Sequence, residues 1–187
     1  MQVISERELR SISSLTAPNA VLAVFKIPET KPVLKKGLAI ALDEINDPGN
    51  LGTIIRLCDW FDIPQILCSQ NTVDCYNPKV VQSSMGSLAR VQINYLDLEE
   101  HLKNEDRTIY GTSMEGESLY ETSFEEDGIL VLGNEANGIS DQIRSLASKE
   151  LSIPQFGSSQ NTESLNVAMA TAIFLSEMRR RSEIPDR

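Results

Sequence analysis

The sequence predicts an α/β fold in which a mostly parallel sheet is covered by helices on both faces. From Gly37 onward, short apolar runs alternate with helix-like segments. This alternation is typical of parallel strands joined by crossover helices. The 187 residues, of which 41% are hydrophobic and 24% charged, suffice for one compact domain with a short arm.

The first 36 residues are expected to form an arm and linker ahead of that domain, which spans residues 37–187. Residues 5–14 have a helical pattern, and the run VLAVFK at 21–26 predicts a strand. Residues 28–36 contain two prolines and three lysines, a composition that predicts a linker.

Short runs rich in leucine, isoleucine and valine predict the strands of the sheet. They lie at residues 38–42, 65–68, 90–93, 108–111, 129–132 and 151–153. Longer amphipathic segments predict helices at residues 52–61, 78–88, 98–104, 140–148 and 164–181. In such folds ligands bind at the carboxyl ends of the strands, so the segments that follow strands are the places to search for a site.

Charge and composition bound the possible functions. Most of the net charge of −10 comes from residues 97–127, where eleven acidic residues stand against two basic ones. A solvated acidic surface explains that stretch and is compatible with an RNA partner at another face. No apolar stretch approaches the roughly 18 residues of a membrane span, and the charged N-terminus is not a secretory signal.

The few cysteines and the single histidine argue against disulfide, metal and triad chemistry. Cys58, Cys68 and Cys75 form no CxxC pair and are expected to be reduced thiols in a cytoplasmic protein. His101 lies in a polar helical stretch and is expected at the surface. No metal is therefore expected.

Three segments look like parts of one site, and the first is NDPGNLGTIIR at residues 46–56. It follows a strand and opens a helix, with Asn50 expected as the N-cap. Gly52 allows another backbone or a ligand to come close. Arg56 stands among apolar neighbours, where a cation needs either a carboxylate partner or a bound anion such as phosphate.

The second segment, GNEANG at residues 133–138, runs from a buried strand towards a helix. It matches neither a GxGxxG fingerprint nor a phosphate-binding P-loop. Glu135 in this loop is either a catalytic or hydrogen-bonding carboxylate or a helix-end cap.

The third segment begins at Ile153, passes through a polar loop and opens a long helix. Ser164 is expected to cap that helix. Capping by Ser164 does not explain why a polar Asn166 stands in the first turn of a largely apolar helix. Asn166 is therefore a candidate site residue at the same helix mouth.

Taken together, the three segments resemble the signature motifs of the SpoU family, also called TrmH, of RNA 2′-O-ribose methyltransferases in the SPOUT superfamily. The resemblance covers about residues 37–181, including the stretch KVVQSSMGS at 79–87. The matching residues are Asn50 and Arg56 in the first motif, Gly133, Asn134, Glu135 and Gly138 in the second, and Ile153, Pro154, Ser164, Leu165, Asn166 and Val167 in the third.

The resemblance implies a deep C-terminal trefoil knot that holds S-adenosylmethionine, and a homodimer with the active site near its interface. The cofactor would be bound by Gly133, Asn134, Gly138, Ile153 and Leu165. The substrate would be a ribose 2′-OH of structured RNA, with rRNA favoured over tRNA.

The catalytic residues implied by the resemblance are Arg56, Asn50, Glu135, Ser164 and Asn166. The family proposal makes the arginine a general base, which is demanding because a guanidinium group has a pKa of about 12.5–13.8. We favour an Arg56 that clamps the target phosphate and stabilises the developing oxyanion, with a base role left open. The other four would position Arg56, the ribose and the methionine moiety.

The chain departs from the family pattern at three places. Trp60, Phe61 and Asp62 follow the first motif, where the family tends to have a small residue, an aromatic residue and a glycine. The polar run at 158–162 is longer than usual. Residues 1–36 are too short for the L30e-like RNA-binding domain of many relatives, and resemble a remnant of its last helix and strand.

Two other functions are weighed against ribose methylation. A catalytically weak RNA-binding or assembly module of the same fold is the main alternative. A nucleotide-dependent oxidoreductase is disfavoured, because no glycine fingerprint follows an early strand.

Overall fold

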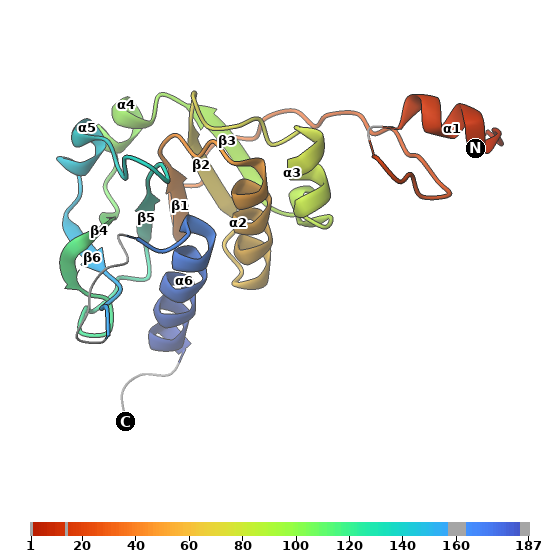
Figure 1. Cartoon of the computed structure of the whole chain (residues 1–187). Helices are drawn as coiled ribbons and strands as arrows, with labels where there is room; N and C mark the ends of the chain where they lie inside the picture. The colour runs from red at the N-terminus through yellow and green to blue at the C-terminus, as the bar shows by residue number, and fades with distance from the viewer. Residues whose placement is uncertain (1, 14, 157–163, 184–187) are drawn as a thin grey trace. The chain divides into compact units, whose positions relative to one another are not determined.

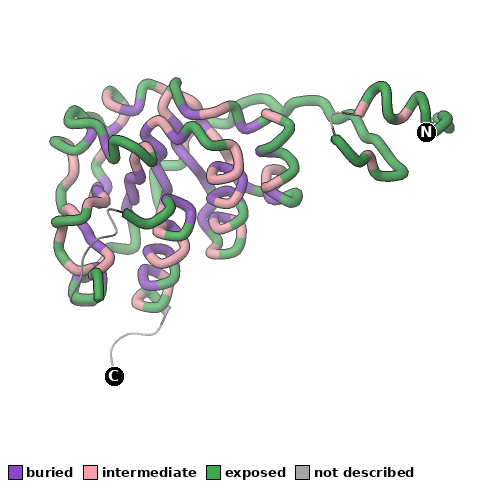
Figure 2. Tube along the Cα trace, in the orientation of Figure 1, coloured by how far each residue is buried: buried purple, intermediate pink, exposed green. Residues whose placement is uncertain are grey.

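The computed structural model describes residues 2–13, 15–156 and 164–183, and it divides at residue 30 into two units. The first unit holds α1 (Glu6–Ile12), which starts from a capping box between Ser5 and Glu8. No described residue of this unit is buried (Figure 2).

The strand predicted at 21–26 was wrong. The described residues offer it no partner strand, and a lone extended segment cannot satisfy its backbone hydrogen bonds. Phe25 is accordingly 84% exposed. The residues after 30 belong to the second unit, where the side-chain amide of Gln65 bonds both the N–H and the carbonyl of Leu34, at 2.9 and 2.7 Å.

The second unit is built on a six-stranded sheet in the order β3-β2-β1-β5-β4-β6, and every neighbouring pair is parallel (Figure 1). The sheet confirms the predicted fold class. The strands are β1 (Leu38–Leu42), β2 (Gln65–Ser69), β3 (Gln92–Leu96), β4 (Thr108–Ser118), β5 (Gly128–Leu132) and β6 (Lys149–Ser152). Three of them differ noticeably from prediction: β3 starts two residues late, β6 starts two residues early, and β4 continues past residue 111 with a register shift between Thr112 and Glu117.

Alternate residues of the central strands point to opposite faces of the sheet, and each face packs against its own hydrophobic cluster. Both faces of the sheet are therefore covered by helices. Ile40 and Leu42 belong to one cluster, and Ala39 and Ala41 to the other. The first face carries α2 (Pro48–Trp60), α3 (Pro78–Ser83), the 3₁₀ turn η1 (Ser87–Ala89) and α6 (Val167–Glu183). The second face carries α4 (Leu98–Lys103) and α5 (Asp141–Arg144).

Several helix boundaries differ from the predictions. The single helix expected at 78–88 is interrupted, because Met85 and Gly86 adopt positive φ values of 50° and 88°. The helix expected at 140–148 is only the four-residue α5. Part of the segment that would form the expected knot, residues 157–163, lies outside the described residues, as does the polar run at 158–162.

The structure agrees with the expectation that the three cysteines are reduced thiols. All three cysteines are free and buried, and burial raises the pKa of the Cys58 and Cys68 thiols. His101 is half-buried rather than fully exposed, with Nε2 3.5 Å from Glu105. In the described ranges no helix is long and apolar enough to cross a membrane, and no group of His, Cys, Asp and Glu could hold a metal ion.

Candidate active site

The first two candidate segments leave the sheet side by side. Segment one follows β1 and segment two follows β5, and these strands pair in register from Leu38 opposite Gly128 to Leu42 opposite Leu132. The peptide N–H of Asp43 extends this pairing by donating to the Leu132 carbonyl at 2.9 Å. Both loops therefore lie at the carboxyl edge of the sheet, where ligands of such folds bind.

The first segment differs from the prediction in its cap. Asp47, not Asn50, is the N-cap of α2, and its Oδ1 accepts from the Asn50 peptide N–H at 2.8 Å. Pro48 takes the first helical position, where its missing N–H has no partner to lose. With the cap supplied by Asp47, the side chain of Asn50 is available for other contacts.

The second segment is a tight backbone loop. Asn134 and Gly138 exchange backbone hydrogen bonds at 2.9 and 2.8 Å, and Gly138 has a φ of +70°. A β-carbon at Gly133 would stand 2.1 Å from the carbonyl carbon of Gly138, so only glycine fits there. Glu135 is exposed on this loop and does not cap α5, whose N-cap is Ser140.

The third segment also has a different cap from the one predicted. Asn166 Oδ1 accepts from the peptide N–H groups of Ala168 at 3.0 Å and Met169 at 3.3 Å, so Asn166 caps α6. Ser164 lies three residues before the helix starts, is exposed, and has no hydrogen bond within the part of the chain that the structure describes. The predicted capping role of Ser164 was therefore wrong.

A chain of side-chain hydrogen bonds joins the three segments. Asn166 Nδ2 donates to Asn50 Oδ1 at 3.0 Å, and Asn50 Nδ2 donates to Glu135 Oε1 at 2.8 Å. The two bonds span 116 and 85 residues of sequence. They fix the orientation of the Asn50 amide, because its oxygen faces a donor and its nitrogen faces an acceptor.

Arg56 lies apart from this chain and is exposed. The buried positions of α2 include Leu51, Ile54 and Cys58, so Arg56 projects from the opposite side of the helix. Its side chain makes no ion pair or hydrogen bond with another described residue. The expectation of an apolar environment was wrong, and so was the alternative of an ion pair with a neighbouring carboxylate.

Gly52 does allow the close approach that the sequence predicted. A β-carbon at this position would stand 1.9 Å from Ser83 Oγ and 3.0 Å from the Ser84 peptide nitrogen. The neighbour is therefore the end of α3. Ser83 Oγ also donates to the Pro48 carbonyl at 3.2 Å, which joins α3 to the mouth of α2.

Two acidic residues that support the site were missed in the sequence. Asp43 is buried, and its Oδ2 accepts from the Ser140 peptide N–H at 2.8 Å. Glu44 has a φ of 59°, and its carbonyl accepts from Asn134 Nδ2 at 2.8 Å. Both tie the loop after β1 to the loop after β5. Their position directly after a buried strand was the available signal.

The predicted cofactor residues belong to the second and third candidate segments. Ile153 is half-buried against the core cluster, just after β6 ends. Leu165 is 50% exposed beside Asn166. Gly133, Asn134 and Gly138 form the tight loop already described.

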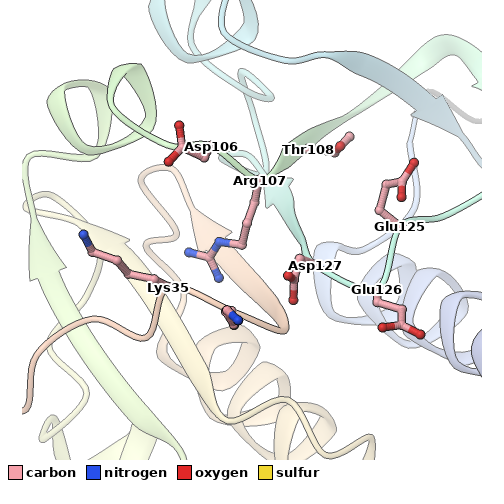
Figure 3. A pocket seen from close by; sticks show the side chains of 8 residues that line it. Lys35, Asp106, Arg107, Thr108, Glu125, Glu126 and Asp127 are labelled. Atoms are coloured by element: carbon pink, nitrogen blue, oxygen red, sulfur yellow. The ribbon is translucent and has the colours of Figure 1, made fainter.

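The hollow in Figure 3 lies at the other edge of the sheet, where β4 and β5 begin. Lysine, arginine and carboxylate side chains line it. Arg107 points into it in Figure 3 and is ion-paired with Glu105 at 2.8 Å, while its Nη1 donates to the Gly37 carbonyl. These bonds give Arg107 a structural role, so this hollow is not the candidate site.

Comparison with known proteins points to one family. The SpoU rRNA Methylase family matches residues 37–176. The chain is 30% identical over 181 residues to the 23S rRNA (guanosine(2553)-2′-O)-methyltransferase of Bacillus subtilis, a match covering 95% of this chain and 71% of that protein.

Two solved structures are also similar to this chain. A TrmH-family protein from Porphyromonas gingivalis is 42% identical with a TM-score of 0.85, over 92% of this chain and 71% of that one. The SpoU methyltransferase AviRb of Streptomyces viridochromogenes, solved with the cofactor AdoMet, is 28% identical with a TM-score of 0.75, over 87% and 65%. The chain belongs to the SpoU family of RNA methyltransferases.

Proposed function

We propose that this protein transfers a methyl group from S-adenosylmethionine to a ribose 2′-OH of RNA. The observation that carries the proposal is the hydrogen-bond chain from Asn166 through Asn50 to Glu135, which joins one polar residue from each family motif. Such a chain holds polar groups in fixed directions beside the glycine loop, as a positioning site requires.

The residues at this edge fit S-adenosylmethionine. Gly133 has no side chain, so the loop presents its backbone to a ligand. Ile153 and the half-exposed Leu165 offer apolar surface that would hold an adenine ring. The cofactor supplies a methyl group activated by its sulfonium sulfur.

The reaction breaks the bond from sulfur to methyl, forms a bond from the methyl to the 2′ oxygen, and releases the hydroxyl proton. Asn50 and Glu135 would orient the ribose hydroxyl, and Asn166 would fix Asn50. Arg56, exposed and unpaired within the described residues, would bind the phosphate of the target nucleotide and stabilise the developing negative charge.

Arg56 projects from the outer side of α2, and we infer that a second copy of the chain covers this side. Trp60, four residues on, is 84% exposed, and Met169 on the neighbouring α6 is 59% exposed. A homodimer would bury these apolar side chains and bring Arg56 to the substrate. Replacing Trp60 by glutamate should then give a monomer by sedimentation.

We also propose the family's C-terminal knot and a ribosomal substrate. β6 lies at the sheet edge, yet Asn166 returns to bond Asn50 beside the central strands, a path that suits threading. Ribosomal RNA is preferred because the Bacillus subtilis relative is a 23S rRNA methyltransferase.

The test pairs methyl transfer with cofactor binding. Arg56→Ala should keep the affinity for S-adenosylmethionine and the melting temperature, because the Arg56 side chain is exposed and forms no hydrogen bond or ion pair with another described residue. It should remove transfer to unmodified ribosomal RNA, measured with methyl-labelled cofactor. Near-normal turnover would refute the proposed role of Arg56. Failure of the unaltered protein to bind the cofactor in calorimetry would favour an RNA-binding module without transfer.

A further inference from the structure

Two cationic side chains flank the hydrogen-bond chain of the candidate site: Lys79 has one long ion pair, of 3.7 Å, and Arg144 has none within the described residues. We propose that Lys79 and Arg144 bind RNA backbone phosphates on the two sides of the target nucleotide. This inference rests on the proposed function, because it assigns the neighbouring contacts of the same substrate.

Lys79 stands at the mouth of α2. Its Nζ lies 3.7 Å from Asp47 Oδ2, while the other oxygen of that carboxylate accepts from the Asn50 peptide N–H. Lys79 and Asn50 are therefore held by one carboxylate. Its Cε also lies 3.9 Å from the β-carbon position of Gly49. The side chain is 62% exposed, so the ammonium group remains open to a ligand.

Arg144 stands at the loop that carries Glu135. Its Nη2 lies 3.9 Å from the point where a β-carbon of Gly138 would stand. Arg144 is exposed, and its guanidinium forms no ion pair within the described ranges. It belongs to α5, on the opposite face of the sheet from α3. The two cations thus approach the carboxyl edge from opposite faces, α3 and α5 lying on either side of β1 and β5 in Figure 1.

Several other cationic side chains of this unit are held in shorter ion pairs. Arg90, Lys103 and Arg107 form ion pairs of 2.6, 2.5 and 2.8 Å, whereas the ion pair of Lys79 with Asp47 is longer, at 3.7 Å. In a chain with a net charge of −10, exposed cations beside the reacting groups that have a long ion pair or none are the groups that can receive a polyanion. Phosphate contacts would set the position of the RNA and leave base recognition to other residues.

The test measures affinity for unmodified ribosomal RNA made by transcription, at several salt concentrations. Lys79→Gln and Arg144→Gln should each weaken binding by about 3- to 10-fold and lower the salt slope of log affinity by about one. The double variant should lower the slope by about two. Lys79→Arg should keep the slope, since it keeps the charge. Lys103→Gln, which removes one exposed cation from the acidic stretch, is the matched control.

Two further readouts separate this role from folding or chemistry. Affinity for S-adenosylmethionine and turnover at saturating RNA should stay within about twofold of the values of the unaltered protein. The melting temperature should stay within a few degrees. Slopes equal to that of Lys103→Gln would overturn the proposal even if the unaltered protein methylates RNA. Lowered slopes in a protein that transfers no methyl would support these contacts while overturning the proposed function.

Discussion

Replacing Asn166 by aspartate separates the two contacts that this residue makes. The Asn166 oxygen caps α6 through Ala168 and Met169, and a carboxylate can keep those bonds. The Asn166 nitrogen donates to Asn50 Oδ1 at 3.0 Å, and an aspartate oxygen there meets another acceptor. Rotating the Asn50 amide would not relieve the conflict, because its oxygen would then face Glu135.

The substitution is expected to stabilise helix α6 but to weaken the positioning of Asn50. A carboxylate at the start of α6 stabilises the helix by about 0.3–1 kcal/mol, which raises the melting temperature by up to about 4 °C. Loss of the bond to Asn50 removes about 0.5–1.5 kcal/mol of positioning. If that positioning acts in the transition state, kcat/KM falls by about 2- to 13-fold.

The assay compares kcat/KM for RNA methylation with the melting temperature for Asn166→Asp, Glu135→Gln and the double variant. In the double variant, an amide at 135 can donate to Asn50 while Asn50 donates to the new carboxylate, so the chain reforms with reversed direction. The double variant is therefore expected to lose less transition-state stabilisation than the sum of the losses in the two single variants. Unchanged kcat/KM in Asn166→Asp, or a melting temperature lowered by many degrees, would refute the reasoning.

Three further outcomes are expected. Gly133→Ala should abolish cofactor binding in calorimetry and lower the melting temperature, since its β-carbon would overlap the Gly138 backbone; unchanged binding would contradict the loop geometry. A hydrogen bond from Arg180, with support from Arg181, lowers the pKa of Glu177 from 4.5 to about 2, so the stabilisation is complete above about pH 4.5 and disappears as the pH falls towards 2. Glu177→Gln should therefore lower the urea-measured free energy of unfolding by about 1–3 kcal/mol at pH 7 and by much less near pH 2. A thiol reagent should label none of the three buried cysteines in the native protein and all three in urea, because burial raises the pKa of each thiol.

The strands were predictable because their residues are buried on both faces. Runs such as LAIAL at 38–42 contain no polar residue, as expected for a strand buried on both faces. The continuation of β4 beyond residue 111 was missed because TSMEGES shows no apolar pattern, and after Thr112 its pairing with β6 resumes only at Glu117, with a register shift. Residues 21–26 have strand-like composition, but a strand also needs a partner, which local sequence cannot supply.

The sequence predicted which residues meet at the site better than it predicted their capping roles and exposure. The carboxyl-edge rule brings Asn50 and Glu135 together, since both follow neighbouring parallel strands. The helix starts were misassigned because several residues near each start can cap, and only the backbone path selects Asp47 and Asn166. The exposure of Arg56 could have been predicted, because two residues along a helix place it about 200° from Ile54.

The side-chain partners of Asn50 lie far along the sequence, and this separation has a consequence for synthesis of the protein. Asn50 leaves the ribosome long before Asn166, its partner 116 residues away. A growing chain that has made β1 and β5 already contains Asn50 and Glu135, but the donor that orients Asn50 has not been translated. The site is thus completed only near the end of translation, so a truncated product would contain most of the sheet without an ordered reaction centre.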